Sequence, residues 1–337
     1  MTDPDLLAAP KVLLHDHLDG GLRAETVLEL ADAAGYTGLP ARDPDALAQW
    51  FRDSADAGSL PRYIDTFEHT VAVMQTQEAI ARVAAEAVID LAADGVLYAE
   101  LRFAPALATR RGLGLDEVID AMVAGQRAGE SLAAGEGRSI VTGVLVCGMR
   151  QEDSVLDVAQ AAIRHHGNGV VGFDLAGPEA GFPASRHADA LGLLRAAGVP
   201  LTLHAGEAFG PSSVADAVQQ GASRIGHGVR VLEDPELTRR VAAQGIVLEV
   251  APTSNLQTGV ASSYDEHPFK RLVDAGVRVT VNTDNRLMSG TSVSMEMQHL
   301  RDAFGYTLDD FKSFTLTAAR SAFLTDDQRN ALVAQLA

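Results

Sequence analysis

Short β-rich runs alternate with Ala- and Leu-rich helical stretches along almost the whole sequence, and this alternation limits the possible folds more than any other feature. The eight candidate strands cover Lys11–His15, Val96–Phe103, Ile140–Cys147, Gly169–Leu175, Pro200–His204, Ser223–Gly226, Ile246–Val250 and Val277–Val281. Segments with helical periodicity lie between most of them, such as Asp116–Ala133, Ser213–Gln220 and Asp234–Ala243. The pattern predicts a closed parallel (β/α)8 barrel, a TIM barrel, that spans residues 1–337 as a single domain.

The connection between the first two strands, roughly residues 22–94, is too long for a simple barrel crossover and predicts extra helices after the first strand. Within it, apolar side chains recur at helical spacing, at Leu60, Tyr63, Ile64, Phe67 and Val71. Such a stripe can pack as a helix on the barrel and can also form an apolar wall or lid over a pocket. The two roles are compatible.

Composition and charge argue against several classes of protein. The sequence has 27 basic and 45 acidic residues, a formal net charge of −18, so its surface would repel phosphate backbones and we expect no nucleic-acid partner. It has no apolar run long enough for a membrane span, and its acidic N-terminus is unlike a signal peptide. Its single cysteine, Cys147, can form no internal disulfide, and we expect a reduced, cytoplasmic setting.

Polar side chains gather where the candidate strands end, which is the edge of a barrel that carries chemistry. The first strand runs into HDHLD, where strand alternation sends His15 and His17 to the same side. His204 ends the fifth strand, His227 follows the sixth and Asp284 follows the eighth. Uncompensated buried charges cost several kcal/mol, and a bound cation removes that cost.

Three imidazoles and one carboxylate form a nitrogen and oxygen donor set that suits Zn²⁺ best. We assign four ligands to one zinc ion per chain: His15, His17, His204 and Asp284. A catalytic zinc keeps a position for water and lowers the pKa of that water toward about 7. Glu207, three residues beyond a ligand, can deliver a proton opposite the metal. His227 can orient and deprotonate the water, with Asp284 sharing that task.

Seven stretches of the sequence match a known family, each at its expected strand end: KVLLHDHLDGGLR, VLYAELRFAP, GVVGFDLAGPE, LTLHAGE, RIGHGVR, LEVAPTSN and VTVNTDN. On these stretches the chain resembles the adenosine deaminase family of the metal-dependent amidohydrolases, its actinobacterial members in particular, over nearly its whole length. The resemblance implies the same four zinc ligands. It also implies that Glu207 is the proton donor to purine N1 and that His227 lies beside the attacking water.

The resemblance further implies the residues that hold the substrate. The backbone N–H of Gly177 would meet purine N3, where only a residue without Cβ lets a flat ring approach so closely. Asp19 would hold the ribose 5′-hydroxyl, and His17 would also touch the nucleoside. Tyr63 and Phe67 fall where the family places its apolar wall.

One position departs from the family pattern, which has two consecutive aspartates after the eighth strand, the second contacting purine N7. Here the second position is Asn285, followed by Arg286. N7 accepts a hydrogen bond, so a carboxylate there must be protonated, whereas the asparagine NH₂ group donates without that requirement. We therefore expect Asn285 to keep the contact with N7 and the pH dependence of the reaction to change.

Together the residues and the resemblance predict hydrolytic deamination of adenosine, and of 2′-deoxyadenosine, to inosine and ammonia in purine salvage, with no organic cofactor. Deamination of adenine, or of a modified adenine nucleoside such as aminodeoxyfutalosine, is the nearest alternative. A catalytically inactive nucleoside-binding barrel is a third, and the intact set of polar residues argues against it. A two-metal site bridged by a carboxylated lysine is disfavoured, because the fourth strand ends in Asp174 and Leu175 and not in a lysine.

Overall fold

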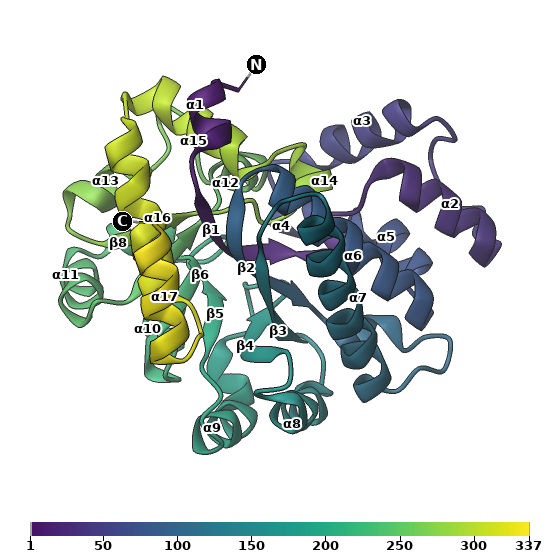
Figure 1. Cartoon of the computed structure of the whole chain (residues 1–337). Helices are drawn as coiled ribbons and strands as arrows, with labels where there is room; N and C mark the ends of the chain where they lie inside the picture. The colour runs from purple at the N-terminus through teal and green to yellow at the C-terminus, as the bar shows by residue number, and fades with distance from the viewer. Residues whose placement is uncertain (1, 337) are drawn as a thin grey trace.

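Eight strands stand in the middle of the computed structural model, which describes residues 2–336 (Figure 1). They are β1 Lys11–His17, β2 Val96–Phe103, β3 Val141–Met149, β4 Val170–Ala176, β5 Thr202–Ala205, β6 Arg224–His227, β7 Val247–Val250 and β8 Arg278–Val281. Each of them overlaps the strand predicted at its place in the sequence, so the predicted order of strands is confirmed.

The strands form one closed barrel. All neighbouring pairs are parallel, and regular pairing gives two four-stranded sheets, β1-β2-β3-β4 and β5-β6-β7-β8. Isolated parallel bridges join the two sheets on both sides, between Phe173 and Leu201 and between Asp16 and Asp284. The backbone N–H of His17 also donates to the carbonyl of Asp284 at 2.7 Å. The predicted TIM barrel is therefore confirmed.

The long first connection folds into five helices, as its length predicts. They are α2 Ala24–Ala34, α3 Pro44–Ala55, α4 Leu60–Asp65, α5 Phe67–Val73 and α6 Gln77–Ala93. Two of them begin at a capping side chain: Asp43 accepts from the Ala46 N–H before α3, and Thr76 accepts from the Ala79 N–H before α6. Figure 1 shows α2, α3 and α5 as a group outside the ring of strands, on the right of the view.

The other helices follow their strands or close the ends of the barrel. They are α1 Pro4–Ala8, α7 Leu115–Gly135, α8 Val155–His165, α9 Ala188–Ala196, α10 Pro211–Gln219, α11 Pro235–Gln244, α12 Pro252–Gln257, α13 Phe269–Asp274, α14 Arg286–Ser289, α15 Val293–Phe304, α16 Leu308–Ser321 and α17 Asp326–Leu336. Short 3-10 turns cover Leu18–Gly20, Pro105–Ala108, Ala184–His187 and Val229–Glu233. The C-terminal helix α17 places Leu332 and Leu336 in one apolar cluster with Val12 and Tyr98.

Charged side chains are buried inside the barrel beneath its mouth. The Arg102 guanidinium donates to Asp174 at 2.7 Å and to Glu249 at 2.8 Å, and all three side chains are fully buried. Arg224 bridges Glu249 and Glu100 in the same interior. Removing one partner of such a network leaves an uncompensated buried charge, which costs about 3–5 kcal/mol. The network is therefore a rigid base for the groups above it.

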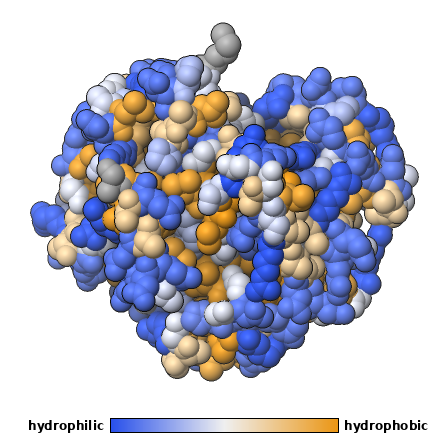
Figure 2. Space-filling view, viewed as in Figure 1, coloured by the Kyte–Doolittle hydropathy of each residue, from blue (hydrophilic) through white to orange (hydrophobic). Residues whose placement is uncertain are grey.

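The outside of the barrel is largely polar. Figure 2 shows hydrophilic side chains over most of this face, with hydrophobic ones gathered near its middle. None of the helices in residues 2–336 combines the length and the apolar content that a bilayer span requires.

Candidate active site

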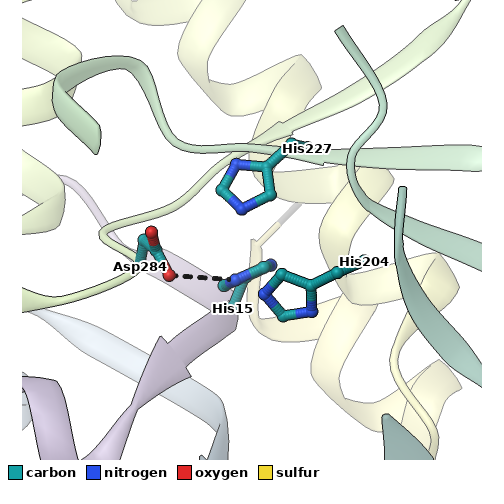
Figure 3. A group of neighbouring side chains, drawn as sticks. All are labelled: His15, His204, His227 and Asp284. Atoms are coloured by element: carbon teal, nitrogen blue, oxygen red, sulfur yellow. Dashed lines mark hydrogen bonds and ion pairs between the residues drawn. The ribbon is translucent and has the colours of Figure 1, made fainter. Parts of the chain in front are cut away.

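Four side chains from four different strand ends converge at the mouth of the barrel (Figure 3). They are His15 in β1, His204 in β5, His227 at the end of β6 and Asp284 after β8. One ligand atom of each lies within 4.8 Å of the corresponding atom of every other. This confirms that the strand ends bring these residues together, and Figure 3 shows the side chains gathered around a common space.

His17, which the sequence predicts as a ligand, lies against the same group. Its Nε2 atom is 3.2 Å from Nε2 of His204 and 3.4 Å from Oδ1 of Asp284. Nε2 of His15 is 3.2 Å from the same Asp284 oxygen. A tetrahedral zinc with bonds of about 2.0–2.1 Å separates its ligand atoms by about 3.3 Å. The four predicted ligands therefore fit a zinc ion, and His227 is a fourth histidine at the same centre.

Buried carboxylates fix which nitrogen of two predicted ligand histidines faces the centre. Nδ1 of His15 lies 3.1 Å from Glu249, and Nδ1 of His204 lies 2.9 Å from Asp174. An ionised carboxylate can only accept, so Nδ1 of each imidazole carries a proton, and Nε2 is the nitrogen whose lone pair a bound cation would take. Although burial raises the pKa of Glu249, Arg102 and Arg224 hold it below its ordinary value, which keeps this acceptor ionised.

Burial sets the charge of the site. It lowers the pKa of His17 and His204, so both imidazoles are neutral at pH 7. Burial raises the pKa of Asp284, but the hydrogen bond and charge of His15 hold it well below its ordinary value. The neutral imidazoles of His17 and His204 thus lie beside a carboxylate that stays ionised, which is the environment of a cation.

The backbone is strained where it delivers two of these side chains. Among the non-glycine residues that the structure describes, only His227 and Asp284 have positive φ, 61° and 57°. An L-residue in this left-handed region costs about 1–2 kcal/mol. Such strain persists where the surrounding structure enforces it, and it clusters at functional sites.

A cavity of about 650 Å³ opens onto the cluster, a size typical of small-molecule sites. All six residues predicted to contact the substrate line it: His17, Asp19, Tyr63, Phe67, Gly177 and Asn285. The apolar stripe of the first connection contributes Leu60, Ile64 and Val71 as well, so its role as a wall is combined with packing on the barrel. The predicted pocket is therefore assembled as one space.

Three polar atoms at this cavity have no hydrogen-bond partner among residues 2–336. One is Oδ1 of Asp19, a side chain that is 4% exposed and whose pKa burial raises to about 7. Another is Oε1 of Gln151, and the third is Oδ1 of Asn285. A Cβ on Gly20 would lie only 1.9 Å from that oxygen, so the close approach of Asn285 to the chain requires glycine there. Buried polar atoms left unpaired in this way are available to a ligand.

The loop after β5 presents Glu207 to the cavity. Burial raises the pKa of Glu207 well above its ordinary value, and the charges of Asp284 and Glu179 raise it further. Glu179 holds the loop: its carboxylate accepts from four consecutive backbone amides, those of residues 206, 207, 208 and 209. The site therefore contains a positioned acid.

Comparison with known proteins places the chain in a family. The adenosine deaminase family model matches residues 10–337. An adenosine deaminase of Mycolicibacterium vanbaalenii is 51% identical over 99% of this chain and 95% of its own length. The chain belongs to the adenosine deaminase family. Another relative, adenosine deaminase 1 of Streptomyces coelicolor, is 51% identical over 96% of this chain and 85% of its own length.

Solved structures with 25–26% identity share the fold of this family member over nearly all of both chains. An adenine deaminase of Arthrobacter aurescens has a TM-score of 0.87 and covers 98% of each chain. An N6-mAMP deaminase of Arabidopsis has a TM-score of 0.88 and covers 99% of each chain. An amidohydrolase of Burkholderia ambifaria, with a TM-score of 0.87 over 98% of this chain and 90% of its own, was solved with bound Zn.

Several residues hold the site in place although the sequence analysis predicts no role for them. Ser254 donates to Oδ2 of Asp284 at 2.6 Å, and the amide nitrogen of Asn255 is 3.0 Å from Nδ1 of His227. Both lie in LEVAPTSN, a stretch whose polar run after a buried strand was the available signal. Arg286, beside Asn285, donates to Asp16 at 2.7 Å, so its positive charge is paired with a carboxylate of β1.

Proposed function

We propose that the chain hydrolyses the 6-amino group of adenosine and 2′-deoxyadenosine, releasing inosine or deoxyinosine and ammonia. The observation that carries this proposal is that Glu207, whose pKa burial raises, lines the same cavity as three histidines and Asp284. Membership of the adenosine deaminase family and relatives about half identical to the chain support it. A small purine nucleoside is thus the expected partner of this enzyme.

We propose His15, His17, His204 and Asp284 as the ligands of one zinc ion, which would activate a water molecule as the nucleophile at neutral pH. The ligand spacing near 3.2–3.4 Å supports this set. Glu249 and Asp174 keep the Nε2 lone pairs of His15 and His204 turned to the centre.

The chain's own residues then position the purine and move its protons. Glu207 donates its proton to purine N1, which lets C6 become tetrahedral without negative charge on the ring. His227 and Asp284 face the attacking water. Gly177, whose φ of +103° is a glycine conformation, leaves room for the ring to approach its backbone N–H at N3.

The remaining contacts orient the nucleoside. The NH₂ group of Asn285 donates to N7, Oδ1 of Asp19 binds the 5′-hydroxyl, and His17 also touches the nucleoside. Tyr63 and Phe67 cover the flat ring and exclude water. Holding the purine in one orientation over the water lowers the entropic part of the barrier.

The test follows the ultraviolet absorbance of adenosine over time with purified, zinc-loaded protein, in parallel with 2′-deoxyadenosine and adenine. We expect rapid conversion of both nucleosides and loss of at least about 100-fold in kcat with Glu207→Gln, which keeps the side-chain shape but cannot give up a proton in the same way. Turnover of adenine alone, the substrate for which the Arthrobacter aurescens adenine deaminase is named, would move the assignment to the free base. Silence on all aminopurines would refute it.

A further inference from the structure

The strand-seven stretch LEVAPTSN ends in Asn255, and the contacts of this residue determine which nitrogen of His227 carries a proton. Asn255 is fully buried and lies between two imidazoles. Its Oδ1 is 3.2 Å from Nε2 of His267, and its Nδ2 is 3.0 Å from Nδ1 of His227. Turning the amide over exchanges its oxygen and nitrogen. The donors and acceptors in this series of hydrogen bonds must therefore be assigned from its other end, at His267.

A backbone hydrogen bond fixes the tautomer of His267 at that end. The N–H of Phe269, the first residue of α13, donates to Nδ1 of His267 at 3.1 Å. Nδ1 of His267 is therefore an acceptor and has no proton. His267 is 2% exposed and burial lowers its pKa to about 3, so the ring is neutral and its only N–H is at Nε2. This N–H donates to Asn255, whose facing atom is then its carbonyl oxygen.

The remaining proton positions in this series of hydrogen bonds follow from hydrogen-bond chemistry alone. With Oδ1 accepting from His267, the NH₂ group of Asn255 faces His227 and donates to its Nδ1. Because Nδ1 of His227 accepts this hydrogen bond, it carries no proton, and the ring is neutral. Its single proton is on Nε2, the nitrogen on the side of the cavity, 3.6 Å from the carboxyl of Glu207.

We propose that Asn255 and His267 are positioning residues that fix the tautomer of His227, so that this imidazole presents an N–H, and no lone pair, to the reacting groups. The inference rests on the proposed deaminase function and refines the role of one residue in it. His227 then orients the attacking water as a hydrogen-bond donor, and removal of the proton from that water falls to Asp284. A nitrogen that carries a proton also cannot bind a metal, which leaves His17 as the third histidine ligand.

The direct test is a nitrogen NMR spectrum of zinc-loaded protein with ¹⁵N-labelled histidine, near neutral pH. The nitrogen shifts and ring couplings distinguish a protonated from an unprotonated Nδ1. We expect an unprotonated Nδ1 and a protonated Nε2 for His227. His187 is an internal reference, because its Nε2 is 2.8 Å from the carbonyl oxygen of Arg150, which can only accept.

Three variants separate tautomer control from simple packing. Asn255→Asp replaces the donor by an acceptor of the same shape, so it should move the proton of His227 to Nδ1 and lower kcat for adenosine by about 100-fold, with a much smaller change in KM. His267→Leu removes the donor to Asn255, which frees the amide to turn and should give a mixture of tautomers. His267→Gln offers both an N–H and a carbonyl, so it should restore the wild-type tautomer and most of the lost kcat.

The outcomes are distinct. A wild-type spectrum with a protonated Nδ1 on His227 would overturn the proposal even if Asn255→Asp fails to fold. An unchanged tautomer and unchanged kcat in both Asn255→Asp and His267→Leu would also overturn it. The spectrum needs no substrate, so the expected tautomer together with no turnover of adenosine would refute the proposed function and leave the tautomer assignment standing.

Discussion

Glu179 anchors the loop that carries Glu207, the proposed proton donor, and replacing Glu179 by glutamine tests how much that anchor contributes. Its Oε2 accepts from the amides of residues 207, 208 and 209 at 3.1, 2.7 and 2.9 Å, and its Oε1 accepts from the amide of Gly206. The side chain is only 5% exposed, so water replaces these bonds poorly. The variant Glu179→Gln keeps the shape of the side chain but has a single accepting oxygen.

The expected loss of stability follows from the number of hydrogen bonds that a single accepting oxygen can retain. If it takes the place of Oε2, the Gly206 N–H faces the new NH₂ group and loses a bond to a charged acceptor, a loss of about 1.5–3 kcal/mol. The other three bonds weaken because their acceptor is no longer charged. We expect a loss of about 3 kcal/mol in the free energy of unfolding, and at least a tenfold loss in kcat/KM because Glu207 is part of this loop.

Urea unfolding and adenosine kinetics measure both quantities on the same zinc-loaded protein. Glu152→Gln is the matched control, because it makes the same change of charge at an exposed position. If Glu179→Gln unfolds at the same urea concentration as the wild type and keeps kcat/KM within about twofold, the four bonds do not hold the loop and the reasoning is wrong.

Four further predictions follow from the site and its surroundings. Burial raises the pKa of Glu207, and catalysis needs its protonated form, so a plot of kcat/KM against pH should fall as pH rises through that pKa; a profile with no alkaline decline contradicts this. Asn285→Asp should add a second alkaline decline, because an aspartate must be protonated to donate to purine N7; kcat/KM of the two proteins compared across pH decides it. Burial raises the pKa of Glu296 from 4.5 to about 7, so its contribution to stability is present below pH 4.5 and is lost as pH rises to about 7. Glu296→Gln should therefore unfold with about 3 kcal/mol more free energy than the wild type near pH 8 and with no such gain below pH 4.5, as measured by urea titrations at both pH values. Finally, a strong chelator should abolish activity and lower the melting temperature, and added Zn²⁺ should restore both; activity that survives exhaustive chelation would refute the metal assignment.

The eight strands could be predicted because each reads as a short apolar run between helical segments, and the barrel follows from their number. The convergence of the site residues could be predicted for a related reason. His15, His204 and Asp284 end or follow parallel strands, and the carboxyl ends of such strands meet at one edge of the barrel. The apolar wall at Tyr63 and Phe67 also could be predicted, because helical spacing of apolar residues places them on one face.

The groups that hold the site could not be predicted in the same way, because they depend on register and side-chain direction across the barrel. Glu249 reaches His15 from β7, and Asp174 reaches His204 from β4. Nothing in the local sequence around either acid distinguishes it from a structural ion-pair partner of Arg102, which it also is. Glu179 likewise acts through the backbone of a loop 27–30 positions away, a contact with no signature in spacing.

Histidine side chains take opposite roles in this site because their Nδ1 atoms face different partners. Nδ1 of His15 and of His204 faces a carboxylate, which forces the proton onto Nδ1 and leaves Nε2 free to bind a cation. Nδ1 of His227 faces the amide of Asn255, whose orientation is set by His267, and this forces the proton onto Nε2. The five residues at the strand ends can therefore lie around one centre without all five acting as ligands of one ion. Exchanging the partner behind an imidazole, by Asn255→Asp, should convert a donor into a candidate ligand, so zinc titration of that variant should reveal an altered metal affinity if the partner, and not the histidine itself, decides the role.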